Sequence, residues 1–179
     1  MEIRKAKRED AAFVAWTVLA ALDMDTSDLE KASDVCSGDF GLYSWKNAMI
    51  AEEDGKPIGC IISYPGDKYL QFREYTWPKL WTDIDPVLMK NTPHETEPGE
   101  YYLDSMAIIP EYRGKAIGKK LMLSAIEHGK DLGCEKFALI VDVNKPHLHD
   151  YYSQLGFTDA GSIRFFTHLF TKMMKTTSK

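Results

Sequence analysis

The chain has 179 residues and a mass of 20.4 kDa, a length that predicts one domain with a sizeable buried core. Its 22 basic and 27 acidic residues give a net charge of −5, which disfavours a broad nucleic-acid-binding surface because phosphate neutralisation needs clustered Lys and Arg. The three cysteines form no CxxC pair, so we expect reduced thiols in a cytoplasmic protein rather than a disulfide framework.

The first expected elements are a short strand around Ile3 and a buried helix over residues 11–22. Basic residues before this apolar stretch superficially imitate a secretion signal, but Glu9 and Asp10 interrupt them and no A-x-A cleavage site follows. The stretch is also well short of the ~18 apolar residues of a membrane span. Both acids suit the positive end of a helix dipole, so we expect neither export nor a membrane partner.

Residues 49–53 and 58–64 are predicted as two strands joined by Asp54-Gly55, a dipeptide typical of tight hairpins. Residues 65–99 differ from the rest of the chain, since they hold five prolines and a cluster of aromatic side chains. A structureless insertion of this length is unusual in a compact domain, so we expect short helices that form a lid or side wall. A cover over the sheet or a dimer contact is an equal alternative.

The following segment has an α/β pattern. We predict a strand over 101–109, a helix over 116–132 that ends at Gly133, and a buried strand over 137–143. Strand, helix and strand in this order form a βαβ unit whose two strands are parallel through a right-handed crossover.

The last part of the chain is predicted to hold a shorter helix over 147–155, a closing strand over 165–173 and a basic tail over 172–179. His147 and His149 form an H-x-H pair in the helix. No well-spaced third ligand accompanies them, so we expect no metal site.

The most informative stretch is the turn over residues 109–121, where free backbone N–H groups at a helix start can bind phosphate oxygens. Residues 111–120 hold four basic side chains against one acid, a local charge of +3 in an acidic protein, which predicts a small anionic ligand. A P-loop is disfavoured because the spacing from Gly114 to Gly118 is one residue short and Lys120 replaces the magnesium-binding hydroxyl. The GxGxxG dinucleotide fingerprint is also absent.

This turn resembles the pyrophosphate loop of the GNAT superfamily of acetyl-CoA-dependent N-acetyltransferases, which reads Arg or Gln, two residues, Gly, one residue, then Gly or Ala. Residues 113–118 lie on this pattern, with Ala116 where Gly is usual. A right-handed helix start tolerates Ala without strain, so we expect binding to survive. Residues 152–157, Tyr-Ser-Gln-Leu-Gly-Phe, preceded by Asn144, resemble the late motif of the same family.

The resemblance implies an α/β fold, with a GNAT-like mixed, mostly antiparallel sheet, a central parallel βαβ pair and helices on both faces. It implies a single acetyltransferase domain over residues 1–179, although the resemblance covers only residues 1–24, 47–65 and 100–171. The insertion at 65–99 lies outside the resemblance, and we expect it to form a lid on the substrate side. It also implies acetyl-CoA as co-substrate, held by the turn, by backbone groups of the preceding strand and by two later side chains: Met106, Ala107, Ile108, Arg113, Gly114, Lys115, Ala116, Ile117, Gly118, Lys119, Asn144 and Tyr152.

The reaction that the resemblance implies is direct attack of an amine on the acetyl thioester, which needs a group to take the amine's proton. An alkyl ammonium of pKa ~10.4 costs about 4.6 kcal/mol to deprotonate at pH 7, so a nearby carboxylate is expected. Asp104 is the first candidate because it lies on the strand that approaches the thioester. Glu100 is the second, on the same face by strand alternation. A hydrogen-bonded strand acid without a catalytic role is an equal alternative for Asp104.

Tyr152 matches the family's tyrosine and is expected to donate a proton or a hydrogen bond to the leaving thiolate, while Tyr151 is expected to pack. Trp77 and Trp81, four residues apart, either line an acceptor pocket or pack a helix inward, and packing is favoured. Lysines beside the turn are candidates for attracting phosphates, although a solvated helix face suits at least one of them: Lys115, Lys119 and Lys120.

The sequence therefore predicts an N-acetyltransferase that moves the acetyl group of acetyl-CoA to a primary amine of a small molecule or peptide in a ternary complex. The rival interpretation is a non-catalytic acyl-CoA-binding sensor or regulatory module. Three of the basic residues lie in the last eight positions, so the body before them is more acidic still and favours a cationic acceptor. The aromatic insertion and the terminal strand leave a homodimer open.

Overall fold

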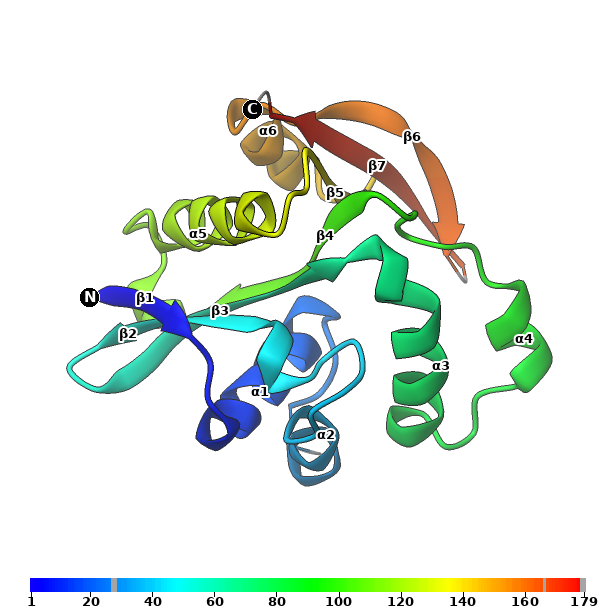
Figure 1. The fold of residues 1–179 in the computed structure, drawn as a ribbon, viewed down its shortest axis with the longest axis horizontal. Coiled ribbons are helices and arrows are strands. Elements are labelled where there is room, and N and C mark those ends of the chain that lie inside the picture. Colours follow the sequence, from blue (N-terminus) through cyan, green and yellow to red (C-terminus); the bar gives the residue numbers. More distant parts are fainter. Residues whose placement is uncertain (27–28, 166, 178–179) are drawn as a thin grey trace.

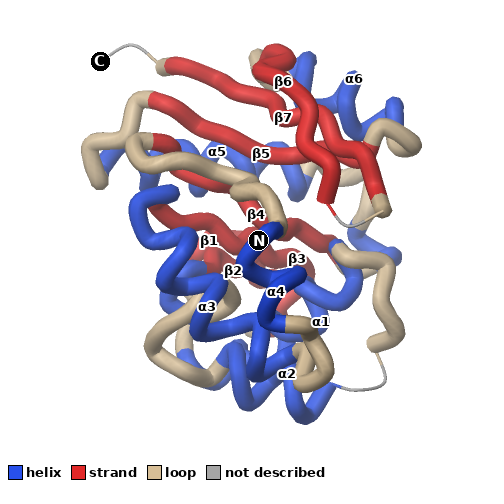
Figure 2. The backbone as a smooth tube through the Cα atoms, turned by 90° about the vertical axis from the view of Figure 1, so that its right-hand side faces the viewer, coloured by secondary structure: helices blue, strands red, loops and turns tan. Residues whose placement is uncertain are grey.

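The computed structural model describes residues 1–26, 29–165 and 167–177. Its strands form a twisted sheet of seven strands in the described residues, in the order β1-β2-β3-β4-β5-β7-β6 (Figure 2). Neighbouring strands are antiparallel except for the parallel pair β4 and β5. The strands are β1 (Glu2–Lys5), β2 (Ala48–Glu53), β3 (Lys56–Pro65), β4 (Glu100–Ile108), β5 (Lys136–Asp142), β6 (Thr158–Phe165) and β7 (His168–Thr176).

Helices lie on both sides of this sheet. Figure 1 shows α1, α2 and α3 on one side and α5 on the other, with α4 beyond α3. The helices are α1 (Ala11–Ala21), α2 (Leu29–Cys36), α3 (Tyr69–Leu80), α4 (Pro86–Asn91), α5 (Ile117–Asp131) and α6 (Pro146–Gln154). Short 3₁₀ turns connect some of the elements: η1 (Arg8–Asp10), η2 (Trp45–Asn47), η3 (Gly66–Lys68) and η4 (Pro110–Tyr112).

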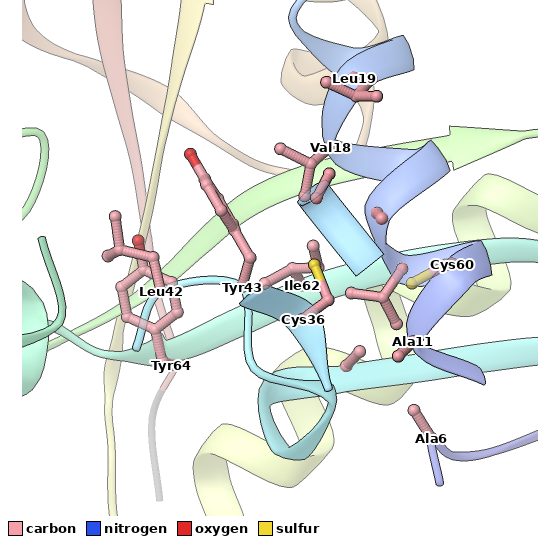
Figure 3. Packing of buried hydrophobic residues seen from close by; sticks show 14 of the residues in the cluster. Ala6, Ala11, Val18, Leu19, Cys36, Leu42, Tyr43, Cys60, Ile62 and Tyr64 are labelled. Carbon is pink, nitrogen blue, oxygen red and sulfur yellow. The ribbon is translucent and has the colours of Figure 1, made fainter. Parts of the chain in front are cut away.

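Two hydrophobic clusters, one on each face of the sheet, hold these layers together. The first joins α1, α2 and α3 to β3, and Figure 3 shows Val18, Cys36 and Ile62 meeting there. The second joins α5 and α6 to the other face, with Leu121 and Phe137 fully buried. Burial on both faces explains why β3 and β5 read as continuous apolar runs.

The predicted βαβ unit is confirmed as β4, α5 and β5, with each boundary within one residue of the expected one. Residues 65–99 contain η3, α3 and α4, in agreement with the short helices expected there. No helix in the described part of the chain combines the length and apolarity that a bilayer span requires.

The end of the chain differs from the prediction of one strand over 165–173. Two strands form a hairpin there, and residues 172–176, expected to begin a basic tail, belong to β7. Lys172 is bound to Glu100, so its charge is used inside the fold rather than in a tail. Residues 166 and 178–179 lie outside the described residues. The prediction missed β6 because its side chains are mostly exposed and show little apolar alternation.

Candidate active site

The centre of the site is the stretch of β4 where its pairing changes on both edges. Toward β3 the register shifts, since Ile62 faces Ser105 and Ser63 faces Leu103, which leaves Asp104 as the extra residue of a β-bulge. Such a bulge bends the strand and redirects a side chain. Toward β5, the parallel register runs only from Glu100 to Tyr102, although β4 continues to Ile108.

The two strands therefore separate beyond Tyr102, and the backbone of the following residues of β4 is not paired with β5. Met106, Ala107 and Ile108 lie on this separated part and are half-buried. Because alternate amides of β4 point toward the opening, they are available to a ligand that enters between the strands. These are the residues of the strand before the turn whose backbone groups the sequence resemblance assigns to acetyl-CoA.

The turn before α5 adopts two left-handed residues, Gly114 with φ 79° and Ala116 with φ 57°. The expectation that Ala116 begins a right-handed helix without strain is wrong, because the helix starts one residue later, at Ile117. Arg113, just before these residues, is extended, with φ −64° and ψ 156°. A turn of this kind can direct neighbouring N–H groups toward one point, which suits an anion. The first amides of α5 add the positive end of the helix dipole.

Basic side chains surround this turn on its solvent side. Arg113 donates from Nε to the Ile108 carbonyl at 3.1 Å, which ties the turn to the end of β4. The Lys115 ammonium lies 4.5 Å from the centre of the Tyr112 ring. Lys119 is exposed on the first turn of α5. The local positive charge predicted from the sequence is thus gathered at one helix start.

Gly118 lets α5 approach the end of β4 and the tyrosines of α6. A Cβ atom at this position would lie 3.2 Å from the Tyr151 hydroxyl, 3.3 Å from Ile108 and 3.4 Å from the Met106 methyl carbon. The phenol of Tyr151, expected only to pack, therefore reaches the edge of the glycine turn. A side chain at 118 would require the ends of these three side chains to move by a few tenths of an ångström.

Tyr152 lies on α6, with its ring edge-on to both Tyr151 and Phe157. Burial raises the pKa of the Tyr152 phenol to about 12, so the group keeps its proton firmly at neutral pH. Asn144 follows β5, and its side-chain amide donates to the Asp142 carboxylate at 3.0 Å.

A cavity of about 970 Å³ lies next to β4 and β5, and its lining includes no residue of the glycine turn. Its lining is rich in carboxylates and aromatic rings, contributed by the end of α1, the insertion, β4, β5 and the β6–β7 hairpin. These residues are Asp23, Asp83, Glu95, Asp104 and Asp142, with Tyr43, Trp77, Trp81, Tyr102, Phe165 and Phe170. Lys145 and His168 also line it, paired with Asp23 and Asp142 respectively.

Asp104 stands at the inner wall of this cavity. Its carboxylate accepts hydrogen bonds from the Tyr64 phenol and from the Ser105 hydroxyl, the latter at 2.7 Å. Burial raises the pKa of the Asp104 carboxyl, while the two hydrogen bonds oppose this effect. A carboxylate with a raised pKa at a cavity wall is well suited to accept a proton near neutral pH.

Glu100 occupies a different environment from Asp104. It accepts from Lys172 at 2.8 Å, from the Thr96 hydroxyl at 2.8 Å and from the Glu97 amide at 2.9 Å. These contacts occupy both of its oxygens inside the fold, and Glu100 does not line the cavity, so it is not placed to meet a substrate there. Strand alternation alone could not separate the two acids.

Glu95 is a carboxylate of the cavity that sequence reasoning did not single out. It accepts from the Tyr69 phenol at 3.0 Å and from the Tyr102 phenol at 2.6 Å. It comes from the irregular segment before β4, where no periodicity predicts which way a side chain faces. In the sequence, Glu95 differs from its neighbours only in being one of several acidic residues in the insertion.

Trp77 and Trp81 pack against each other, as favoured from the sequence, and that either one contacts an acceptor stays a prediction. Their rings meet edge-on at 5.9 Å, and both also line the cavity. His149 binds the Asp159 carboxylate at 2.7 Å. Among the described residues, no group of three or more His, Cys, Asp or Glu side chains is arranged to hold a metal ion.

Comparisons with known proteins place the chain among acetyltransferases. Residues 16–157 match the Acetyltransferase (GNAT) family. The thialysine N-epsilon-acetyltransferase of Sus scrofa is 41% identical over 165 residues, which cover 88% of this chain and 84% of that protein.

Solved structures show the same architecture. An N-acetyltransferase from Staphylococcus aureus Mu50 superposes with a TM-score of 0.79 at 25% identity, covering 98% of this chain and 100% of the other. A GNAT family acetyltransferase from Brucella melitensis, solved in complex with acetyl-CoA, has a TM-score of 0.57 at 20% identity. The match covers 99% of this chain and 88% of that protein's chain.

Proposed function

The chain belongs to the GNAT family of acetyltransferases, and we propose that its acceptor is a small cationic amine bound in the cavity beside Asp104. The enzyme transfers an acetyl group from acetyl-CoA to an amine nitrogen. A single acetyltransferase domain over residues 1–179 carries this activity, and residues 65–99 form the acceptor-side wall. The relative from Sus scrofa is named for acetylating the ε-amine of thialysine, which supports an amine of this class.

The residues around the separated strands fit acetyl-CoA. The left-handed turn at Gly114 and Ala116 offers amides for a pyrophosphate, with Arg113, Lys115 and Lys119 nearby. The pantetheine chain would run along Met106, Ala107 and Ile108, with Asn144 and Tyr152 on the opposite side. When bound there, acetyl-CoA supplies the acetyl group as an activated thioester.

The acceptor class is argued from the charges of the cavity. Lys145 and His168 each pair with one of its acids, so Asp83, Glu95 and Asp104 are left to face a substrate. Carboxylates attract an ammonium by charge, and aromatic walls stabilise it through their ring faces. A neutral or anionic amine would gain neither interaction.

Asp104 is the proposed proton acceptor, and its position is the observation on which the proposal rests. It lies on the bulge between the cavity and the opened strand end, so an amine held by its carboxylate faces the place where the thioester would sit. Amides of β4 beyond the bulge can hydrogen-bond the acetyl oxygen as negative charge develops on it. Tyr152, whose pKa of about 12 makes complete proton transfer uphill, donates a hydrogen bond to the departing sulfur.

A cytoplasmic location is proposed from the thiols. Cys36, Cys60 and Cys134 are free. Burial raises the pKa of both Cys36 and Cys60 to about 12, so neither is readily oxidised.

The first test is thermal unfolding with saturating acetyl-CoA, with CoA and ATP as controls. At a hundred times the dissociation constant, binding adds ~2.7 kcal/mol, a shift of roughly 5–10 °C for a domain of this size. We expect a shift with acetyl-CoA and CoA but not with ATP. No shift at millimolar acetyl-CoA would contradict the proposed binding site.

The second test is a panel of amines, with CoA release measured at saturating acetyl-CoA. Cationic acceptors, such as polyamines and lysine-like amines, are expected to have the highest kcat/KM. Neutral or anionic amines that consistently perform better would contradict the cationic class. Binding of acetyl-CoA without transfer to any amine would favour the non-catalytic sensor instead.

A further inference from the structure

Two carboxylates stand at the inner wall of the cavity, and the reaction as proposed uses only Asp104. Glu95 enters from the segment between α4 and β4 and lines the same cavity. Its two oxygens are each held by one phenol, Oε1 by Tyr69 and Oε2 by Tyr102. We propose that Glu95 and Asp104 act as one carboxylate dyad that receives the proton of the acceptor ammonium. The inference rests on the proposed function and adds a second catalytic residue to it.

The segment that carries Glu95 is anchored by Arg73 of α3. This side chain is only 3% exposed, and it donates from one terminal nitrogen to the carbonyls of Thr92 at 3.1 Å and Pro93 at 3.2 Å. Its guanidinium also stacks over the rings of Tyr69 and Trp77. Glu95 is therefore placed by a buried network rather than by a loose loop.

The environment of Glu95 makes it a stronger base than a solvated glutamate. Burial, and then the charge of Asp104, raise the pKa of the Glu95 carboxyl to about 7, although the phenol hydrogen bonds and Arg73 oppose the shift. The groups facing it come from α3, β3, β4 and the segment before β2: Tyr69, Arg73, Tyr64, Tyr102, Asp104 and Tyr43. The phenols that bind the two carboxylates, Tyr64 at Asp104 and Tyr102 at Glu95, have ring centroids 5.9 Å apart, so the two acids belong to one group of side chains. A neighbouring negative charge disfavours the ionisation of both acids, so the pair binds a proton more tightly than either acid alone.

The proton transfer balances within the dyad. Both negative charges attract the ammonium of the acceptor. One N–H bond breaks, one carboxyl O–H bond forms, and the electron pair left on nitrogen becomes the nucleophile. The proton stays on the dyad, stabilised by the charge of the second carboxylate, and returns to water before the next turnover.

The test is the pH dependence of kcat/KM for one cationic acceptor at saturating acetyl-CoA, in wild type, Glu95→Gln, Asp104→Asn and the double variant. The wild-type profile is expected to rise through about pH 7. Glu95→Gln should move this acid limb to lower pH by on the order of one unit, because Asp104 loses a neighbouring negative charge. Its plateau should fall about 10-fold, since Asp104 alone is a weaker base.

The double variant separates a dyad from two independent acids. If the carboxylates act as a unit, the double variant is about as slow as the slower single variant. A double variant whose loss equals the product of the two single losses would overturn the dyad. An unchanged acid limb in Glu95→Gln would overturn it as well.

Two further variants test whether the shift of the acid limb is specific to Glu95. One should move the limb in the opposite direction, and the other is a control that should not move it. Tyr102→Phe removes a donor that stabilises the charged form of Glu95, so the acid limb should move to higher pH. Glu97→Gln, two residues along with a 57% exposed side chain, should stay within about two-fold of wild type with the same limb. Thermal shift with CoA confirms that each variant keeps its fold and its acetyl-CoA site.

A measurement without substrate distinguishes this inference from the proposed function. Carbon NMR of labelled carboxyls in the wild-type protein should show Glu95 and Asp104 titrating in two linked steps, one of them near pH 7. Two separate titrations at ordinary values overturn the dyad even if acetyl transfer occurs. No acetyl transfer by the wild-type enzyme overturns the proposed function, and the catalytic role of the dyad with it.

Discussion

Ala116 holds a backbone conformation that glycine adopts at lower cost. Its φ of 57° is left-handed, which costs an L-residue about 1–2 kcal/mol because Cβ crowds the following carbonyl. We predict that Ala116→Gly raises the free energy of unfolding by about 1 kcal/mol. Urea denaturation with an unchanged m-value measures this gain.

Gly114 supplies the control of opposite sign at the same turn. It has φ 79° and no neighbour within contact of an added Cβ, so Gly114→Ala introduces left-handed strain without a clash. The variant should lose about 1 kcal/mol. An Ala116→Gly protein that is no more stable than wild type would show that the turn stores no such strain.

Tyr152 illustrates how a pKa limits a catalytic role. Its phenol, with a pKa of about 12, cannot fully protonate a thiolate whose conjugate thiol has a pKa near ~8.5. We predict that Tyr152→Phe lowers kcat only about 10-fold, the value of one hydrogen bond, since the ring still packs on Phe157. Steady-state kinetics that determine both kcat and the KM for acetyl-CoA would measure this loss of kcat.

Tyr151→Phe is the matched control, because it removes the phenol hydroxyl of the adjacent residue, whose ring packs edge-on against Tyr152. It should leave kcat within about two-fold, as expected of a substitution outside the reacting groups. A loss of a thousand-fold or more in Tyr152→Phe would contradict the hydrogen-bond role and establish complete proton transfer.

At the scale of elements, α5 depends on one glycine for its position on the sheet. A Cβ at Gly129 would lie 2.6 Å from the Phe137 ring and 2.8 Å from the Tyr101 ring. These two residues face each other in the short register between β4 and β5, just before the strands separate. We predict that Gly129→Ala lowers the free energy of unfolding by about 3 kcal/mol through overpacking.

Thermal unfolding checks this, with an expected loss of roughly 6–12 °C at this chain length. Glu127→Ala, on an exposed position of the same helix, is the control and should change stability by less than about 0.5 kcal/mol. A Gly129→Ala protein as stable as this control would show that α5 can move off the sheet at little cost.

The elements were predictable where their side chains repeat with a clear period. The apolar run of β5 and the helical pattern of α5 appear in the sequence as they do in the fold. In contrast, β6 is exposed along most of its length, and α2 is short and polar on average, so neither pattern stood out.

The site was predictable to the same degree. The turn around Gly114 is local in sequence, and its residue types indicate its function directly. The bulge at Asp104 depends on how β4 pairs with β3, and the contact of Glu95 with Tyr69 and Tyr102 depends on how the insertion folds back. Such long-range features leave no local pattern, which is why Glu95 was passed over. Ala116 was placed in the wrong backbone region for another reason, since alanine at the start of a helix normally indicates a right-handed residue and its φ is 57°.

At the scale of the whole molecule, two opposite charge patterns serve the two substrates. The net charge is −5, the cavity is lined by five carboxylates, and the positive charge gathers at the turn before α5. A cleft of one sign concentrates ligands of the other and speeds their association. We therefore predict that the cavity attracts a cationic acceptor while the turn before α5 attracts acetyl-CoA.

This separation predicts how salt affects the enzyme. With acetyl-CoA saturating, kcat/KM for a dicationic acceptor should fall about 10-fold between 10 mM and 300 mM salt, because the Debye length shrinks from about 30 Å to less than 8 Å. A neutral acceptor should show almost no dependence. Stopped assays of CoA release over a salt series, for both acceptors, measure the two slopes.

Two variants locate the origin of the effect. Asp83→Asn removes an exposed charge from the cavity lining and should reduce the slope for the dication. Glu127→Gln removes a charge from α5 on the other face of the sheet, where the net charge changes equally but the cavity does not, and should leave the slope as it is. If both variants reduce the slope alike, the overall charge steers the acceptor and the cavity carboxylates do not. If Asp83→Asn alone reduces it, the local field of the cavity selects a cation before any contact with Asp104 is made.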